Sequence, residues 1–144
     1  MPRHLKTQFV VADGARARWV KRSDRANDFV TEREIEAEPL PSGQPKGVVY
    51  ESSAGRPFNV EERHDAVRQH HERFACKIAE VINAQAATEP LERLAVVAPS
   101  RVLSVINRRL SGVASAKLAK TLAKDLTKVP DHELGTWLRD LEFG

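Results

Sequence analysis

The chain has 144 residues, of which 41% are hydrophobic and 30% are charged. This length is typical of one domain, so we expect a single domain over residues 1–144. No apolar run approaches the ~20 residues of a membrane-spanning helix, and no secretory signal is visible, so we expect no membrane partner. The single cysteine, Cys76, cannot form an internal disulfide, which favours a reducing compartment and predicts the cytoplasm.

The net charge of +3 is unevenly distributed along the chain. Residues 93–128 contain one acidic residue, Asp125, and carry a net charge of +7, whereas the remainder carries −4. The segment is equally typical of a solvated surface that maintains solubility and of a face that contacts a polyanion. Its eight basic residues are Arg93, Arg101, Arg108, Arg109, Lys117, Lys120, Lys124 and Lys128.

The N-terminal part of the chain predicts an antiparallel meander. Residues 7–12 are a short apolar run typical of a buried strand, and Asp13-Gly14 supplies a tight turn into a second strand over residues 15–21. Alternation in that strand places its arginines, Arg18 among them, on a face toward solvent or a partner. A third strand is predicted over residues 29–35.

A long loop is predicted over residues 39–59, because this stretch contains four prolines and three glycines. Loops of this length are uncommon in compact domains and are either functional or mobile. Its glycines would allow a ligand to approach the backbone, and Lys46 and Arg56 would supply charge. Ordinary turn chemistry explains the glycines equally well.

A long helix is predicted over residues 60–86, and acidic residues near its start favour its dipole. Its apolar stripe, at close to 3.6-residue spacing, comprises Val67, His71, Phe74, Ile78, Val81 and Ile82. Residues 91–98 then form an apolar run of strand length, as expected for a strand buried on both faces. A helix between two strands implies a crossover, and therefore a mixed sheet.

The C-terminal third predicts helices around one ambiguous segment. A short helix over residues 102–110 follows Pro99-Ser100, either of which is a typical helix-starting residue. Residues 111–128 have helical spacing and an alanine-rich composition, with a poorer strand alternation. A terminal helix is predicted from about residue 130 to 141, burying Leu134, Trp137 or Leu138, and Leu141.

Most motifs that would carry chemistry are missing. His64, His70, His71 and Cys76 share one predicted helix, but no two of them have the three- or four-residue separation that places two metal ligands on one face. His71 is expected to be partly buried, and His64 and His70 to face solvent. Cys76 lies outside the apolar arc, with no histidine base placed by the sequence to activate it. Neither phosphate-binding glycine loops nor a GxSxG turn occurs, so we expect no metal and no cofactor.

One short feature has two explanations. Residues 98–101 form a predicted strand-to-helix turn, in which backbone N–H groups and the guanidinium of Arg101 would hold a phosphate. The alternative, which the sequence favours, is a helix cap with an exposed arginine.

Five phrases in order resemble the bacterial host attachment family, described as proteins required for attachment to host cells. They are VADGARAR at 11–18, AGR at 54–56, ERFA at 72–75, LAVVAPSR at 94–101 and KDLTKVP at 124–130. The resemblance covers nearly the whole chain.

The resemblance implies a fold similar to the middle domain of archaeal and eukaryotic peptide release factors. That fold is α/β, with a mixed, roughly five-stranded sheet of ribonuclease H-like topology and helices packed on it. It implies that residues 116–123 form the fifth strand, against their helical pattern. In those release factors a Gly-Gly-Gln tripeptide on the long loop positions water for peptidyl-tRNA hydrolysis, and the loop here carries Ser42-Gly43-Gln44.

Three functions are compatible with the sequence. The first is a non-enzymatic domain that binds RNA or the ribosome through Lys46, Arg56 and the basic segment, whose contacts would be Arg101, Arg108, Arg109, Lys117, Lys120 and Lys124. The second is a peptidyl-tRNA or ester hydrolase in which Gln44 orients water. The third is an adhesion-related or regulatory protein that acts indirectly in attachment. The oligomeric state is left open by the sequence.

Overall fold

The computed structural model describes residues 7–22, 29–39, 60–89 and 91–143. Its strands are β1 (Thr7–Ala12), β2 (Arg16–Arg22), β3 (Phe29–Glu36), β4 (Arg93–Val97) and β5 (Leu118–Leu122). Its helices are α1 (Val60–Thr88), α2 (Ser100–Arg109), α3 (Gly112–Lys117) and α4 (Gly135–Phe143), with a 3-10 turn over Asp131–Glu133. In these residues no helix is both long enough and apolar enough to span a membrane.

The strands form one mixed sheet in the order β3-β2-β1-β4-β5. β1 pairs antiparallel with β2, and β2 pairs antiparallel with β3. β4 pairs parallel with β1 on one side and with β5 on the other. The mixed sheet predicted from the residues and the five strands implied by the family resemblance are both confirmed. The carboxyl ends of β1, β4 and β5 lie at one edge of this sheet.

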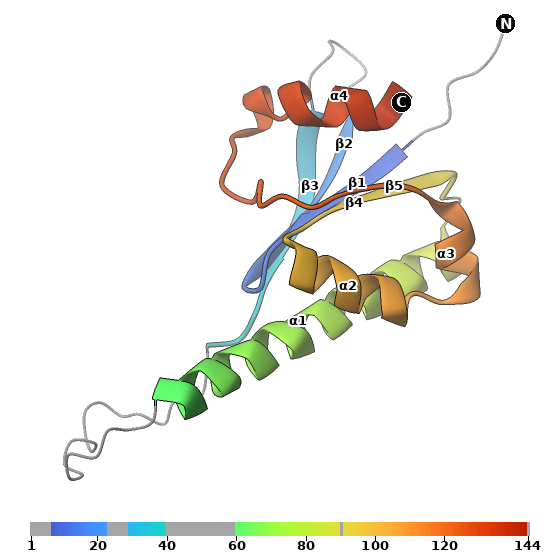
Figure 1. Cartoon of the computed structure of the whole chain (residues 1–144). Helices are drawn as coiled ribbons and strands as arrows, with labels where there is room; N and C mark the ends of the chain where they lie inside the picture. Colours follow the sequence, from blue (N-terminus) through green and yellow to red (C-terminus); the bar gives the residue numbers. More distant parts are fainter. Residues whose placement is uncertain (1–6, 23–28, 40–59, 90, 144) are drawn as a thin grey trace, which may run out of the picture.

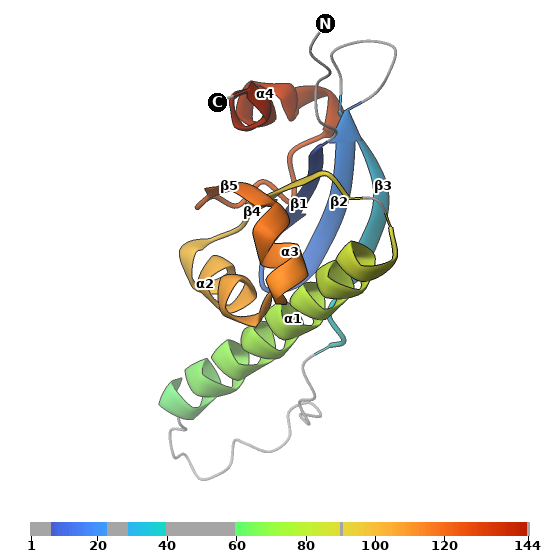
Figure 2. The same cartoon turned by 90° about the vertical axis from the view of Figure 1, so that its right-hand side faces the viewer.

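Helices cover both faces of the sheet (Figures 1 and 2). α1, α2 and α3 pack on the face that carries Val10 and Trp19, and α4 packs on the face that carries Phe9 and Val11. Leu94 to Val97 in β4 are fully buried, because neighbouring strands and both helical layers surround them. This confirms the prediction of a strand buried on both faces.

α1 packs on the sheet over only part of its length. Phe74, Ile78 and Ile82 are buried as predicted, but Val67 is 37% exposed. The prediction for Val67 is wrong because the first turns of α1 run past the sheet, as both views show (Figures 1 and 2). Residues 63–69 are accordingly all exposed.

Hydrogen bonds of side-chain amides hold the C-terminal part of α1 against the sheet. Gln85 Oε1 accepts a hydrogen bond from Trp19 Nε1 at 3.1 Å, and its Nε2 donates to Gln8 Oε1 at 3.0 Å. Gln8 Nε2 in turn donates to the carbonyl of Val20 at 3.0 Å. These bonds satisfy the polar atoms that the packing removes from water.

Arg18 does not face solvent, contrary to the prediction from strand alternation. It is 6% exposed, because the segment between β5 and α4 crosses that face of β2. Its Nη1 donates to the carbonyls of Leu126, Thr127 and Val129 at 3.2, 3.2 and 2.6 Å. A buried cation therefore holds this crossing segment on the sheet.

The ambiguous segment contains both a helix and a strand. Ser111 caps α3, since its Oγ accepts a hydrogen bond from the N–H of Ala114 at 3.1 Å. The backbone becomes extended at Leu118, and β5 then pairs with β4. The fifth strand implied by the family resemblance is thus present, but it begins at Leu118.

The C-terminal helix is present, after the 3-10 turn. Leu134 and Leu138 are fully buried against the sheet, and Trp137 and Leu141 are partly buried beside them. Of the two alternatives left open by the sequence, Leu138 is the residue that enters the core.

Candidate nucleic-acid interface

α2 carries the arginines that the sequence singles out. Val102, Val105 and Ile106 are buried, whereas Arg101, Ser104 and Arg108 are exposed. Positions 101, 104 and 108 follow the i, i+3, i+7 spacing of one helical face, and two turns place Arg101 about 10 Å from Arg108 along the axis. We call these three residues the arginine face.

The C-terminal end of α2 is fixed by a side chain of α1. Asn83 Nδ2 donates to the carbonyl of Arg109 at 3.0 Å, and Asn83 Oδ1 accepts from the N–H of Ser111 at 2.7 Å. The side-chain amide of Asn83 thus satisfies a carbonyl at the C-terminal end of α2 and the N–H of Ser111, the residue that caps α3. No local pattern around Asn83 indicates this role, in which its side chain holds α2 and α3 against α1.

The charges of the arginine face are not neutralised by the described residues. No acidic residue occurs between Arg93 and Asp125 in the sequence. The ion pairs among described residues involve Arg18, Lys21, Arg68 and His132, and none involves Arg101 or Arg108. Arg108 and Arg109 also lie in the last turn of α2, where a cation favours the helix dipole.

The predicted lysines are divided between the two layers. Lys117 ends α3, in the same layer as α2. Lys120 pairs with Ala95, whose side chain belongs to the core on the α4 side, so Lys120 faces that side. Lys124 Nζ lies 4.9 Å from the ring centroid of Trp137 in α4. The structure therefore groups Arg101 and Arg108 but separates them from Lys120 and Lys124.

Three predicted site residues, Gln44, Lys46 and Arg56, lie outside the described residues, as does most of the predicted loop at 39–59. The hydrolase alternative that depends on Gln44 stays a prediction.

Polar side chains gather at the carboxyl edge of the sheet, which sequence analysis did not anticipate. Asp13 Oδ1 accepts from the N–H groups of Ala15 and Arg16 at 2.7 and 2.8 Å. Thr127 Oγ1 lies 2.8 Å from Asp13 Oδ2 and 2.7 Å from Asp125 Oδ1. A hydroxyl has one proton, so it donates to one carboxylate at a time.

The predicted phosphate turn at residues 98–101 lies at this same carboxyl edge. Pro99 precedes the first residue of α2, and no side chain caps the helix. The carboxylates of Asp13 and Asp125 follow the strands on either side of β4 and oppose an anion there. We assign this turn no function, and its binding of phosphate stays a prediction.

The histidines and the cysteine occupy different environments. His71 is partly buried as predicted, and its ring packs closely on the Asp13-Gly14 turn. A side chain at position 14 would not fit there, because its Cβ would lie 2.6 Å from Nδ1 of His71. His64 is exposed as predicted, but His70 is half-buried, contrary to the prediction. Cys76 packs partly against the core. Within the described parts of the chain, no cluster of three metal-ligating side chains occurs.

The sheet order and the helices on both faces define an α/β domain with a mixed five-stranded sheet. Among solved structures, an archaeal translation termination factor, aRF1, is similar to it, with a TM-score of 0.50 and 13% sequence identity. The match covers 94% of this chain and 38% of that chain, so the chain spans well under half of the factor's length. At this identity the likeness shows the fold alone.

A family model described as "Protein required for attachment to host cells" matches residues 8–138. The chain belongs to this family. No curated protein matches the sequence closely enough for a comparison. The family resemblance inferred from the sequence is therefore confirmed.

Proposed function

We propose that this domain binds RNA, free or exposed on the ribosome, through the arginine face of α2, and that it acts as a binding module without catalysis. The observation that carries the proposal is a rigidly held helix that exposes Arg101 and Arg108 with no ion-pair partner among the described residues. Guanidinium groups donate to phosphate oxygens in a bidentate geometry, and burial of Val102 and Ile106 fixes their direction.

Two further features support a polyanion as the partner. Lys117 adds a cation in the same layer, and the chain from Arg93 to Lys124 contains no carboxylate to repel phosphate. The similar fold in a translation termination factor makes RNA the polyanion that we propose. The family description names attachment to host cells, and an RNA-binding module would affect attachment indirectly, through gene expression.

The test is a filter-binding titration of the full chain against tRNA and ribosomes at several salt concentrations. We expect binding at low salt that weakens steeply between ~50 and ~200 mM salt, because each phosphate contact releases counterions. Arg101→Gln combined with Arg108→Gln should lower the affinity at least tenfold at low salt and reduce the salt slope by roughly 1 to 2.

The matched control removes the same charge elsewhere. Arg63 and Arg68 are exposed on the projecting end of α1, and Arg68 Nη1 lies 3.9 Å from Asp65 Oδ1, one turn earlier on the same helix. Arg63→Gln combined with Arg68→Gln should leave the salt slope unchanged. Equal losses in both double variants would show a nonspecific charge effect, and no association at low salt would end the proposal.

A further inference from the structure

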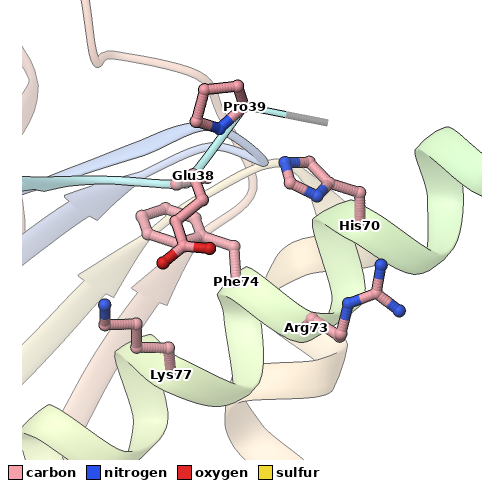
Figure 3. A pocket seen from close by; sticks show the side chains of 7 residues that line it. Glu38, Pro39, His70, Arg73, Phe74 and Lys77 are labelled. Carbon is pink, nitrogen blue, oxygen red and sulfur yellow. The ribbon is translucent and has the colours of Figure 1, made fainter. Parts of the chain in front are cut away.

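A small hollow lies on the flank of α1 that faces away from α2. It has a volume of about 320 Å³ and lies between α1 and the chain that leaves β3 (Figure 3). This volume is near the small end of the ~300–1,000 Å³ typical of ligand pockets, so it suits one ring system with one charged group. Its lining comprises Ala37, Glu38, Pro39, His70, Arg73, Phe74 and Lys77.

The inner part of the hollow is apolar and flat-sided. Phe74 is 4% exposed and lies at its base. The imidazole of His70 points from α1 toward the segment that carries Pro39 (Figure 3). The wall opposite α1 is held in place, because the N–H of Ala37 donates to the carbonyl of Ala15 at 2.8 Å. The base would contact only the exposed part of the nearly buried Phe74 ring, and Pro39 and His70 supply the remaining flat surface.

The rim of the hollow is charged. Arg73 and Lys77 lie one helical turn apart and therefore project from the same flank of α1. Among the described ion pairs, neither has a carboxylate partner, although Glu38 lines the same hollow. Two adjacent cations match a phosphate monoester, which carries about −1.5 to −2 charges and three acceptor oxygens at pH 7. Glu38 requires hydrogen-bond donors, such as the amino group of a base or the hydroxyls of a ribose.

We propose that this hollow binds a nucleotide, with the base against Phe74, Pro39 and His70 and the phosphate held by Arg73 and Lys77. The chemistry it recognises is an aromatic base joined to a phosphate. A base and a phosphate occur together in a free mononucleotide, which is a phosphate monoester, and in an unpaired nucleotide of an RNA chain, whose phosphodiester carries a single negative charge. The site is separate from the arginine face, because α1 lies between them, and it does not depend on RNA binding by α2.

The test is a nitrogen–proton correlation NMR titration of the full chain with AMP and UMP. We expect shifts confined to the amides of residues 37–38 and 70–77. Ribose 5-phosphate, which lacks the base, and adenosine, which lacks the phosphate, should each bind at least tenfold more weakly than AMP. A short oligouridylate, compared with UMP, identifies the source: tighter binding of the oligomer indicates an RNA chain, and tighter binding of UMP indicates the free nucleotide.

Variants on the same helix make the test specific. Arg73→Gln combined with Lys77→Gln should weaken AMP at least tenfold, whereas Arg63→Gln combined with Arg68→Gln should leave it unchanged. Both pairs are exposed, so the fold should tolerate both changes. Absence of shifts with millimolar nucleotide would overturn the proposal, as would equal binding of ribose 5-phosphate and AMP.

Failure of this proposal and failure of the proposed function are distinguishable. Arg101→Gln combined with Arg108→Gln should leave the shifts caused by AMP unchanged, because both residues lie on the other side of α1. AMP binding without tRNA binding would remove only the function proposed for α2. Binding of tRNA without any response to nucleotides would remove only the nucleotide site.

Discussion

Arg18 in β2 and Arg101 in α2 differ in burial and in the number of partners that their guanidinium groups contact. The guanidinium of Arg18 is buried and donates to three carbonyls, to the Thr31 hydroxyl and to the carboxylate of Asp131. Arg101 is exposed and has no ion-pair partner among the described residues. Whether a cation stabilises the fold or is available to a partner therefore depends on the layer that covers it and not on the local sequence.

The largest expected effect follows from removing the buried charge. Arg18→Met keeps a side chain of similar length, but it leaves three carbonyls without their donor and Asp131 with Thr31 as its remaining donor. We expect the free energy of unfolding to fall by about 3 kcal/mol, because buried carbonyls lose hydrogen bonds from a charged donor, each worth roughly 1.5 to 3 kcal/mol. The side chain of Asp131 is 42% exposed and stays solvated, so it adds little to this loss. Thermal unfolding should show a decrease in the midpoint on the order of 10 °C.

The matched change at the exposed site is Arg101→Met. Surface substitutions away from special features usually change stability by less than about 0.5 kcal/mol, so its midpoint should stay near that of the wild type. Similar midpoints for the two variants would erase the distinction between the two arginines.

The sequence predicted most of the scaffold because the scaffold depends on local patterns. A few neighbouring residues are enough to predict three parts of it: the burial of β4, the turn at Asp13-Gly14 and the buried stripe of α1 from Phe74 onward. Arg18 could not be placed in the same way, because the cover on its face comes from Thr127 and Val129, more than a hundred residues later. The alternation of β2 is retained, since Ala17 and Trp19 lie on the opposite face, and tertiary packing covers the face that carries Arg18.

The basic segment could be predicted as a charge excess but not as a surface. Arg108 and Lys120 are twelve residues apart, yet they lie in different layers, because Lys120 is in register with Ala95. Sequence distance carries no information about which face of an edge strand a side chain occupies until the register is known. The hollow beside α1 was missed for a similar reason, since Glu38 and His70 meet only in the folded chain.

A smaller effect should appear when the partner of Arg18 is changed. Partial burial raises the pKa of Asp131, but hydrogen bonds from the hydroxyl and N–H of Thr31 and from Arg18 outweigh it, so the pKa is lowered overall. A lowered folded-state pKa stabilises the protein above the unfolded value near 3.9, and this contribution is lost as the pH falls through the folded-state value.

Asp131→Asn removes this contribution and tests its sign. The variant should be less stable than the wild type at pH 7, by about 1 kcal/mol, because the acceptor of Arg18 becomes neutral. The difference should shrink as the pH is lowered below about 4, since the carboxyl binds a proton there in the unfolded state but only at lower pH in the folded state. Urea unfolding at pH 7, 5 and 3 measures both quantities, and a difference that grows toward low pH would contradict the assignment.

The smallest effect concerns Lys124, a cation between the two extremes. It lies over Trp137 in the α4 layer, away from the arginine face, and an exposed contact of this kind contributes about 0.5 to 1 kcal/mol. Lys124→Gln should therefore lower stability slightly, whereas Lys128→Gln, at an exposed position nearby, should not. If the arginine face is the RNA contact, both variants should leave the salt slope of tRNA binding unchanged. A decrease in the slope for Lys124→Gln that equals the decrease for Arg101→Gln would mean that the RNA also contacts the edge of the sheet on its α4 side. Lys124 would then be both a structural cation and an RNA contact, and the separation between the two kinds of cation would fail at this residue.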